Sequence, residues 1–239
     1  MPRVNELFEA WAPKRAALLT EAQGTVRIDK QADTRKSIIR IIGKSSSDPF
    51  IDQPREYEIA PWQSLLVEDG QAVVIGTPLT TGACDPRQIL NLQGREAIAR
   101  YLINEVQRVY RSTGVYISDK HLEVIVRQML RYIQISYEGD TEFLPGEIVD
   151  RFAYMTGNAA IMAQGGEPAQ ARPVLLGLTR AALHTASWVA AASFQETSKV
   201  LTQAAIRGQV DPLRGYKERV VLGAHIPRSV ELRDSSTEI

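Results

Sequence analysis

The chain has 239 residues, of which 44% are hydrophobic and 23% are charged, values that are ordinary for a globular protein. This composition excludes disorder along the whole chain, and no apolar run reaches the roughly 18 residues of a transmembrane helix. The 28 basic side chains balance the 28 acidic ones, so the total charge argues against a simple nucleic-acid-binding domain.

The amino-terminal part of the sequence predicts one short helix and then a β module. Residues 4–11 have an amphipathic pattern that Pro13 would stop. From residue 21 the pattern changes to period-two alternation and short apolar runs, which are typical of strands. We expect strands over 25–28, 37–42, 57–59 and 72–75, with a turn at 68–70. The sequence therefore predicts a small all-β module over 21–84.

Beyond Asp85 and Pro86, which suit an N-cap and a first helical position, the period becomes helical. One helix is expected to end at Gly114, with Ile98 and Leu102 among the residues of its apolar face. A second helix is expected over 119–130. Its apolar stripe comprises Leu122, Ile125, Val126, Met129, Leu130 and Ile133, and Glu123 and Arg127 form an i,i+4 pair on the solvent side.

The rest of the chain has both strand-like and helix-like patterns. Strands and turns are expected over 134–147, a helix near 147–155 and a buried strand over 174–178. Ser193 or Thr197 is expected to open the last helix, which Gly208 ends. The predicted fold class is α+β, a small β module followed by a mainly helical part with a few strands. The predicted divisions are 1–20, 21–84, 85–228 and a flexible tail over 229–239.

Charge is unevenly distributed along the helical part. Residues 87–131 hold eight basic and four acidic side chains, residues 132–171 hold one and six, and residues 172–228 hold eight and three. Because salt screens charges within about 10 Å, these blocks matter more than the balanced total. Two basic blocks flank an acidic one.

No residue set predicts a catalytic or metal site. His121, His184 and His225 are far apart in the sequence and lack the spacing of a zinc site. Cys84 has no nearby base, and a single cysteine without a secretory signal fits a reducing compartment. Glycine-rich phosphate loops and clustered aspartates are also missing.

Residues 67–79 have the turn and strand rhythm of the hammerhead folds that carry biotinyl and lipoyl groups. Such carriers need a lysine at the hairpin tip, and no lysine occurs between Lys44 and Lys120. This argues against a carrier function and leaves a hammerhead-like fold open.

Longer strings resemble one family. Pro-Arg-Val-x-x-Leu-Phe-Glu-Ala at 2–10, the strings at 104–111 and 119–130, Ala-Ala-Ser-Phe-Gln-Glu-Thr at 191–197 and Asp-Pro-Leu-Arg-Gly at 211–215 occur in the order of the bacterial-type RNA polymerase β′ subunit. The resemblance covers residue 2 to about residue 227. The chain resembles the C-terminal portion of β′, after the trigger loop.

The resemblance implies a place for each part. Residues 1–20 would be a helix following the trigger-loop region, and 21–84 would be the jaw, a sandwich-barrel hybrid motif over downstream DNA. Residues 85–228 would form the helical cleft, the switch that hinges the clamp and the clamp base. The family's Asn-Ala-Asp-Phe-Asp-Gly-Asp motif for catalytic Mg²⁺ is absent, as is the trigger helix. We expect either a piece of a split subunit or a truncated product.

The same resemblance, with the basic block over 172–228, gives the candidate site residues. The candidates for DNA contact are Arg180, His184, Lys199, Arg207, Arg214 and Lys217. The switch and hinge candidates are Gly177, Thr179, Ser193, Phe194, Gln195 and Glu196. Gly177 would give backbone freedom, while Ser193 with Glu196 fits a capping box at a helix start. Solvated basic side chains remain the alternative for the cations.

The expected function is a non-catalytic C-terminal segment of β′ in DNA-templated RNA synthesis. Expected partners are the DNA template, the remaining β′ portion and the β, α and ω subunits, with no membrane. This chain would bind no cofactor, and Mg²⁺ would be held by other segments. The expected location is the bacterial cytoplasm, associated with the nucleoid, or a plastid. A non-catalytic nucleic-acid-binding or scaffold fragment is the alternative.

Overall fold

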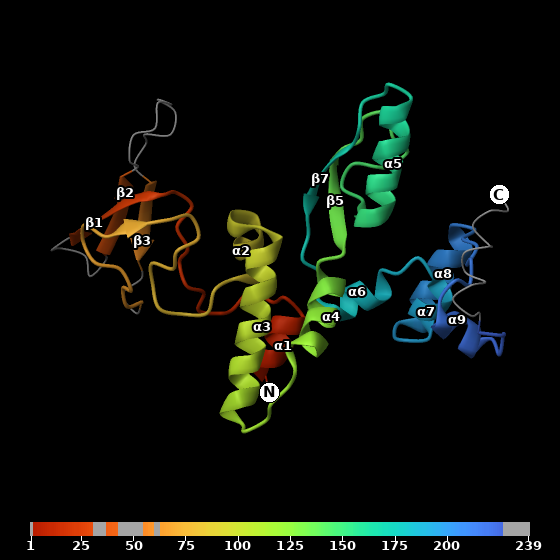
Figure 1. The fold of residues 1–239 in the computed structure, drawn as a ribbon, viewed down its shortest axis with the longest axis horizontal. Coiled ribbons are helices and arrows are strands. Elements are labelled where there is room, and N and C mark those ends of the chain that lie inside the picture. The colour runs from red at the N-terminus through yellow and green to blue at the C-terminus, as the bar shows by residue number, and fades with distance from the viewer. Residues whose placement is uncertain (1, 31–36, 43–54, 60–62, 227–239) are drawn as a thin grey trace. The chain divides into compact units, whose positions relative to one another are not determined.

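The computed structural model describes residues 2–30, 37–42, 55–59 and 63–226 (Figure 1). The chain divides into two compact units, Met1–Gly177 and Leu178–Ile239. The strands of the described residues all lie in the first unit, where they form two antiparallel sheets. This mixture of helices and small antiparallel sheets confirms the predicted α+β class. The predicted tail over 229–239 lies outside the described residues.

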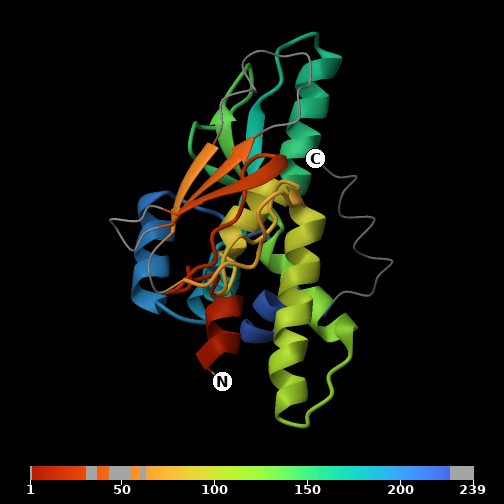
Figure 2. The same cartoon turned by 90° about the vertical axis from the view of Figure 1, so that its left-hand side faces the viewer.

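The first sheet has the strand order β3-β2-β1-β4, and its strands can be followed side by side in Figure 2. The strands are β1 (Gly24–Lys30), β2 (Ser37–Ile42), β3 (Arg55–Ile59) and β4 (Ala72–Val73). Val26, Ile39 and Ile41 are buried and pack with Leu79 into a core of their own. The four predicted strands are present, but the last stops at Val73 because the chain turns before Gly76, whose φ is +80°.

The chain enters and leaves this β module through neighbouring segments. The amide of Thr20 donates to the carbonyl oxygen of Thr77 at 3.0 Å, and the amide of Gly76 donates back to Thr20 at 2.7 Å. One step outward, the amide of Ala17 donates to the carbonyl oxygen of Ala83 at 2.9 Å. The module is thus attached to the rest of the unit by two paired backbone segments.

Helix α1 precedes the β module in the sequence, and helices α2 and α3 follow it. The first helix, α1 (Pro2–Phe8), ends earlier than predicted, and Ala10 then takes a φ of +50°. Asp85 caps α2 (Pro86–Gln93) as predicted, accepting from the amide of Arg87 at 2.9 Å. The single helix expected up to Gly114 is wrong. Gly94, with a φ of +84°, separates α2 from α3 (Arg95–Ser112).

The next helix, α4 (Asp119–Met129), matches its predicted range closely. Val126 and Met129 are buried, whereas Ile125 is only half-buried at the edge of the core. Two details of the prediction are wrong. Ile133 belongs to the following strand, and Glu123 forms no ion pair with Arg127 in the described part of the chain.

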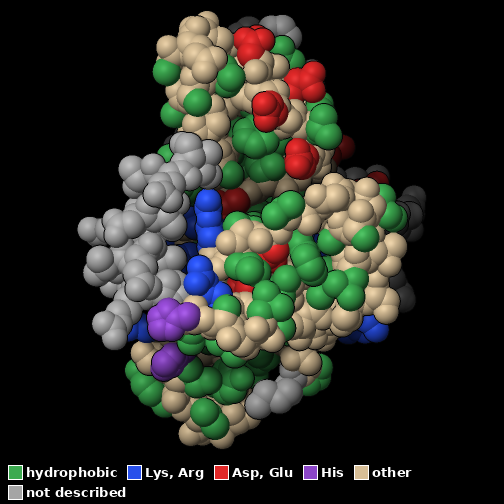
Figure 3. Space-filling view, turned by 90° about the vertical axis from the view of Figure 1, so that its right-hand side faces the viewer, with side chains coloured by type: hydrophobic (Ala, Val, Ile, Leu, Met, Phe, Trp, Pro, Cys, Tyr) green, Lys and Arg blue, Asp and Glu red, His purple; other side chains and the backbone are tan. Residues whose placement is uncertain are grey.

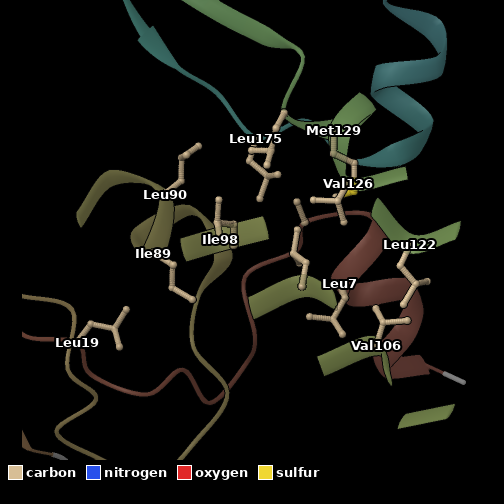
Figure 4. Close-up of a cluster of buried hydrophobic side chains, with 13 residues drawn as sticks. Leu7, Leu19, Ile89, Leu90, Ile98, Val106, Leu122, Val126, Met129 and Leu175 are labelled. Carbon is tan, nitrogen blue, oxygen red and sulfur yellow. The ribbon is translucent and has the colours of Figure 1, made fainter. Parts of the chain in front are cut away.

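The core of the first unit is built by α1 to α4 (Figure 4). Leu7, Ile98, Val106 and Val126 point toward one another there, and Leu175 joins them from the segment that ends the unit. These side chains are at most 6% exposed. Burying each large aliphatic side chain stabilises the fold by about 1.5–3 kcal/mol, so this cluster fixes the helices.

The second sheet and one long helix project from α4. Its strand order is β6-β5-β7, made of β5 (Tyr132–Tyr137), β6 (Ile148–Asp150) and β7 (Gln170–Pro173). Helix α5 (Arg151–Ala163) follows β6 directly, and Asp150 caps it through the amide of Phe152 at 2.7 Å. The helix predicted near 147–155 therefore begins later and runs longer. The acidic block over 132–171 covers this region, and its carboxylates are seen in Figure 3.

The predicted buried strand over 174–178 is wrong. The ladder ends at Pro173, and Leu175 and Leu176 are buried in an irregular segment instead. The amide of Leu176 donates to the carbonyl oxygen of Met129 at 3.0 Å, so this apolar run docks on the end of α4. A short stretch of buried apolar residues occurs in loops as well as in strands, and the length of the stretch does not distinguish the two.

The second unit consists of four short helices in its described residues, 178–226. They are α6 (Leu178–Leu183), α7 (Trp188–Ala192), α8 (Thr197–Ile206) and α9 (Tyr216–Val221). Its described buried residues are four alanines, Ser187 and Glu218.

Candidate functional site

Gly177 is the last residue of the first unit, where the predicted switch begins. It is buried, and a Cβ added there would lie 2.6 Å from the carbonyl oxygen of Glu9. Its φ is not in the left-handed region. The structure adds a steric reason for glycine here, because a side chain at this position would collide with the end of α1.

Helix α6 carries the first candidates for DNA contact. Arg180 is exposed, and its guanidinium forms no hydrogen bond or ion pair with any described residue. His184 is also exposed just beyond the helix, and its amide donates to the carbonyl oxygen of Arg180 at 2.9 Å. Thr179 is half-buried one position before Arg180. Arg180 and His184 thus lie one helical turn apart.

Helix α7 is held at its start by two side chains. Ser187 caps it by accepting from the amide of Ala190 at 3.0 Å, and donates its own hydroxyl to Asp211 Oδ2 at 2.6 Å. The same carboxylate accepts from the amide of Val189 at 3.0 Å and from that of Leu213 at 2.9 Å. Asp211 therefore ties the loop after α8 to the start of α7.

These contacts change the acidity of Asp211. Burial is the largest single influence and raises the pKa of its carboxyl, but the hydrogen bonds from Ser187, Val189 and Leu213 together outweigh it and lower that pKa. Asp211 is therefore held as a carboxylate by its neighbours.

The predicted capping box at 193–196 is wrong. Ser193 ends α7 instead of starting a helix, and its hydroxyl donates to the carbonyl oxygen of Ala190 at 2.9 Å. Glu196 precedes α8 with a φ of +53°, a left-handed conformation that is uncommon for glutamate. Thr197 then donates to the carbonyl oxygen of Ala192 at 2.7 Å and links the two helices. The pattern Ser-x-x-Glu here spans a helix junction.

The remaining switch candidates lie in this junction. Phe194 and Gln195 are both exposed. The Nζ of Lys217 lies 5.5 Å from the centroid of the Phe194 ring, a cation–π contact that joins a switch candidate to a DNA candidate. Lys199 pairs with Glu196 at 2.9 Å on the surface.

The other cations separate into two kinds. Arg207, at the end of α8, and Arg214, before α9, are exposed and form no ion pair among the described residues. Arg219 is structural, since its Nε donates to the carbonyl oxygen of Leu213 at 2.8 Å and its Nη1 to that of His225 at 3.1 Å. Within residues 178–226, Arg180, Arg207 and Arg214 are the arginines whose side chains have no partner among the described residues and are available for an external anion.

Sequence reasoning missed the role of Asp211. Ser187 stands directly before an apolar helix start, which is a readable N-cap signal. Asp211 lies 24 residues from Ser187, and no local pattern connects the two.

Cys84 is half-buried, and burial first, then the charge of Glu105, raises the pKa of its thiol. Burial similarly raises the pKa of Tyr101 to about 12; its hydroxyl donates to the carbonyl oxygen of Cys84 at 3.2 Å. Within residues 2–30, 37–42, 55–59 and 63–226, no three His, Cys, Asp or Glu side chains gather as a metal site. In the same residues, no helix has the length and apolarity needed to cross a membrane.

Known proteins match nearly the whole length of this chain. The family described as RNA polymerase Rpb1, domain 5, matches residues 18–186. The DNA-directed RNA polymerase subunit beta′ of Thermobifida fusca is 47% identical over 227 residues, which cover 95% of this chain and 17% of that subunit. The corresponding subunit of Thermodesulfovibrio yellowstonii is 48% identical over 228 residues, covering 95% and 16%.

The chain thus spans about one sixth of the length of these curated relatives. The matched residues include both sheets, α2 to α5 and the α6 helix that carries Arg180. The chain belongs to the RNA polymerase Rpb1 domain 5 family and corresponds to a C-terminal portion of the β′ subunit.

Proposed function

We propose that the chain acts as the C-terminal segment of a β′ subunit in DNA-templated RNA synthesis, and that it has no catalytic activity alone. The observation that carries the proposal is the 47–48% identity to β′ subunits over 95% of the chain. In this proposal, Mg²⁺ is held by other segments of the assembled enzyme.

Each part has a proposed role. The β module over 21–84 serves as the jaw, with a sandwich-barrel hybrid or hammerhead-like fold, and residues 85–228 serve the cleft, switch and clamp base. The unit boundary after Gly177 supports a hinge at that point, because the predicted switch begins there. Arg180, His184, Lys199, Arg207, Arg214 and Lys217 are proposed to hold DNA through its phosphates, since a polymerase must accept any sequence.

The partners in this proposal are the DNA template, the remaining β′ portion and the β, α and ω subunits. The large apolar side chains that the second unit exposes support such an assembly, because a partner would remove them from water. The proposed location is that of transcription, the nucleoid-associated cytoplasm or a plastid.

Reconstitution tests the proposal. The chain is mixed with β, α, ω and a β′ portion that ends before this segment, and primed-template extension is measured with Mg²⁺ and nucleotides. We expect extension only when the chain is present, and none from the chain alone. Equal extension with and without the chain would contradict the proposal. Binding to DNA without any association with the subunits would support the alternative scaffold or nucleic-acid-binding fragment.

A further inference from the structure

Two adjoining hollows form one groove on the first unit, outside the DNA and switch candidates. The groove lies between α3, α4 and the junction of β6 with α5, and its two hollows have volumes of about 600 and 550 Å³. Arg95, Arg127 and Arg151 line both hollows, and Arg131 lines one. We call this surface, defined by its four arginines, the arginine groove.

The arginine groove holds positive charge that its own residues do not neutralise. Arg131 is paired with Asp150. The guanidinium groups of Arg95, Arg127 and Arg151 form no ion pair or hydrogen bond with any residue that the structure describes. Three arginines in one concave surface therefore remain available for an anionic partner.

Acidic residues also line the arginine groove, but they do not cancel this excess. Glu96 is paired with Arg100 outside the groove at 3.3 Å, and Asp150 is paired with Arg131. Glu123 is the remaining lining acid. A nucleic-acid strand would bring closely spaced phosphates past these three carboxylates, whereas a peptide can place single carboxylates beside single arginines.

The apolar lining also favours a peptide. Phe152 and Met155 are three residues apart on α5 and are 78% and 56% exposed, although both line the groove. Ala99, Ile103 and Leu130 provide apolar surface on the facing helices. Arginine, methionine and aromatic residues are the types enriched in protein–protein interfaces. The amount of exposed Phe and Met surface fits a permanent contact better than a transient one.

We propose that the arginine groove binds an acidic amphipathic segment from the remaining part of the β′ subunit. Carboxylates of that segment pair with Arg95, Arg127 and Arg151, while an apolar side chain covers Phe152 and Met155. The inference rests on the proposed function. We assign the acidic segment to the remaining part of β′ because more than four fifths of the length of each β′ relative lies outside the portion that matches this chain.

Site-specific cross-linking in the reconstituted enzyme identifies the occupant. A benzophenone amino acid replaces Met155 in one sample and Ala160, exposed elsewhere on α5, in the control. We expect the Met155 probe to join a peptide of the remaining β′ portion that contains several Asp or Glu residues. The Ala160 probe should not join that peptide. Cross-links from Met155 to DNA, to another subunit or to no partner would each overturn the inference.

Charge reversal tests the arginines directly. Arg127→Glu with Arg151→Glu is compared with Arg87→Glu with Arg111→Glu, which makes the same change of charge at exposed positions outside the groove. The groove pair should weaken association with the remaining enzyme by about tenfold or more, with the largest difference at low salt. The control pair should retain the parent affinity.

The two proposals fail in different ways. A parent chain that does not associate with the remaining enzyme would overturn the proposed function itself. A parent chain that associates, with a groove variant of equal affinity and unchanged circular dichroism, would overturn only the arginine groove as an interface.

Discussion

The two units of the chain bury very different side chains. The helical core of the first unit buries Leu7, Ile98 and Leu102, each at most 1% exposed. In the described residues of the second unit, the buried apolar side chains are alanines, and Ile206 and Val210 are 80% and 89% exposed. Figure 3 shows hydrophobic side chains exposed among polar ones over the face that is turned to the viewer.

This difference indicates two sources of stability. The first unit is stabilised mainly by burial of large aliphatic side chains. The second unit depends more on local hydrogen bonds, such as those that converge on Asp211, and it leaves several large apolar side chains exposed. The predictions below test this contrast.

Truncation of a leucine should give the largest difference between the units. Leu102→Ala should lower the free energy of unfolding of the first unit by about 2–5 kcal/mol, because it leaves a cavity in a packed core. Leu201→Ala in the second unit should cost less than about 1 kcal/mol, because Leu201 is 43% exposed. Urea unfolding of the full chain, followed by circular dichroism, measures both. Equal losses would remove the contrast.

A charge at the edge of the first core should have the next largest effect. Ile125 is half-buried against the core, whereas its neighbour Val124 is 56% exposed. Ile125→Asp should therefore cost about 1–3 kcal/mol of unfolding free energy, and Val124→Asp much less. Thermal unfolding compares the two variants. If Ile125→Asp melts at the parent temperature, that part of α4 does not pack as described.

Loss of the Asp211 carboxylate should loosen the second unit alone. Asn has one acceptor oxygen in place of two, so Asp211→Asn should cost about 1 kcal/mol locally. Amide hydrogen exchange should accelerate at Val189 and Leu213, whose amides donate to this carboxylate. Glu196→Gln, which removes one surface ion pair, is the control. Unchanged exchange at both amides would show that the network does not hold the unit.

The same residue predicts a pH dependence. The pKa of Asp211 is lower in the folded chain, so its contribution to stability is fully present above the ordinary aspartate value of about 4. It is lost as the pH falls through the lower folded value. Hydrogen exchange at Val189, measured from pH 6 downward after correction for intrinsic rates, should show this loss in the parent, and Asp211→Asn should flatten it.

The smallest effect on stability is expected at the exposed cations. Arg180→Ala should leave unfolding unchanged and, in the reconstituted enzyme, reduce the salt dependence of DNA retention by about one phosphate contact at all sequences. Arg111→Ala, an exposed arginine of the first unit, is the control. If the salt dependence of complex lifetime is the same in both, Arg180 is a solvated side chain.

Local signals accounted for the elements that the sequence predicted correctly. Asp85 followed by Pro86 combines a cap and a pre-set backbone angle, so the start of α2 was readable. Gly94 was missed as a helix break because glycine inside an apolar repeat is often tolerated. Ser193 with Glu196 misled because the same spacing also fits a helix end followed by a left-handed residue.

Long-range contacts explain what could not be predicted. The hydrogen bond of Ser187 to Asp211 depends on the tertiary fold, and so does the placement of Arg95 and Arg151 in one groove. Residue spacing does not encode either. The DNA contacts stay a prediction. An exposed arginine can contact a phosphate without packing against other residues of the chain, so the fold does not distinguish it from a solvated arginine. The family, by contrast, could be recognised from long irregular strings such as residues 119–130.

The paired entry and exit of the β module make it separable in design. Thr20 and Thr77 already lie one hydrogen bond apart, and Leu19 stays with the helical core on the near side of that pair. A short turn joining these two threonines would close a small loop at little entropic expense. Replacing residues 21–76 by such a turn would leave the α1 to α4 core packed, but Leu79, which lies outside that range, would lose the sheet residues that it packs against.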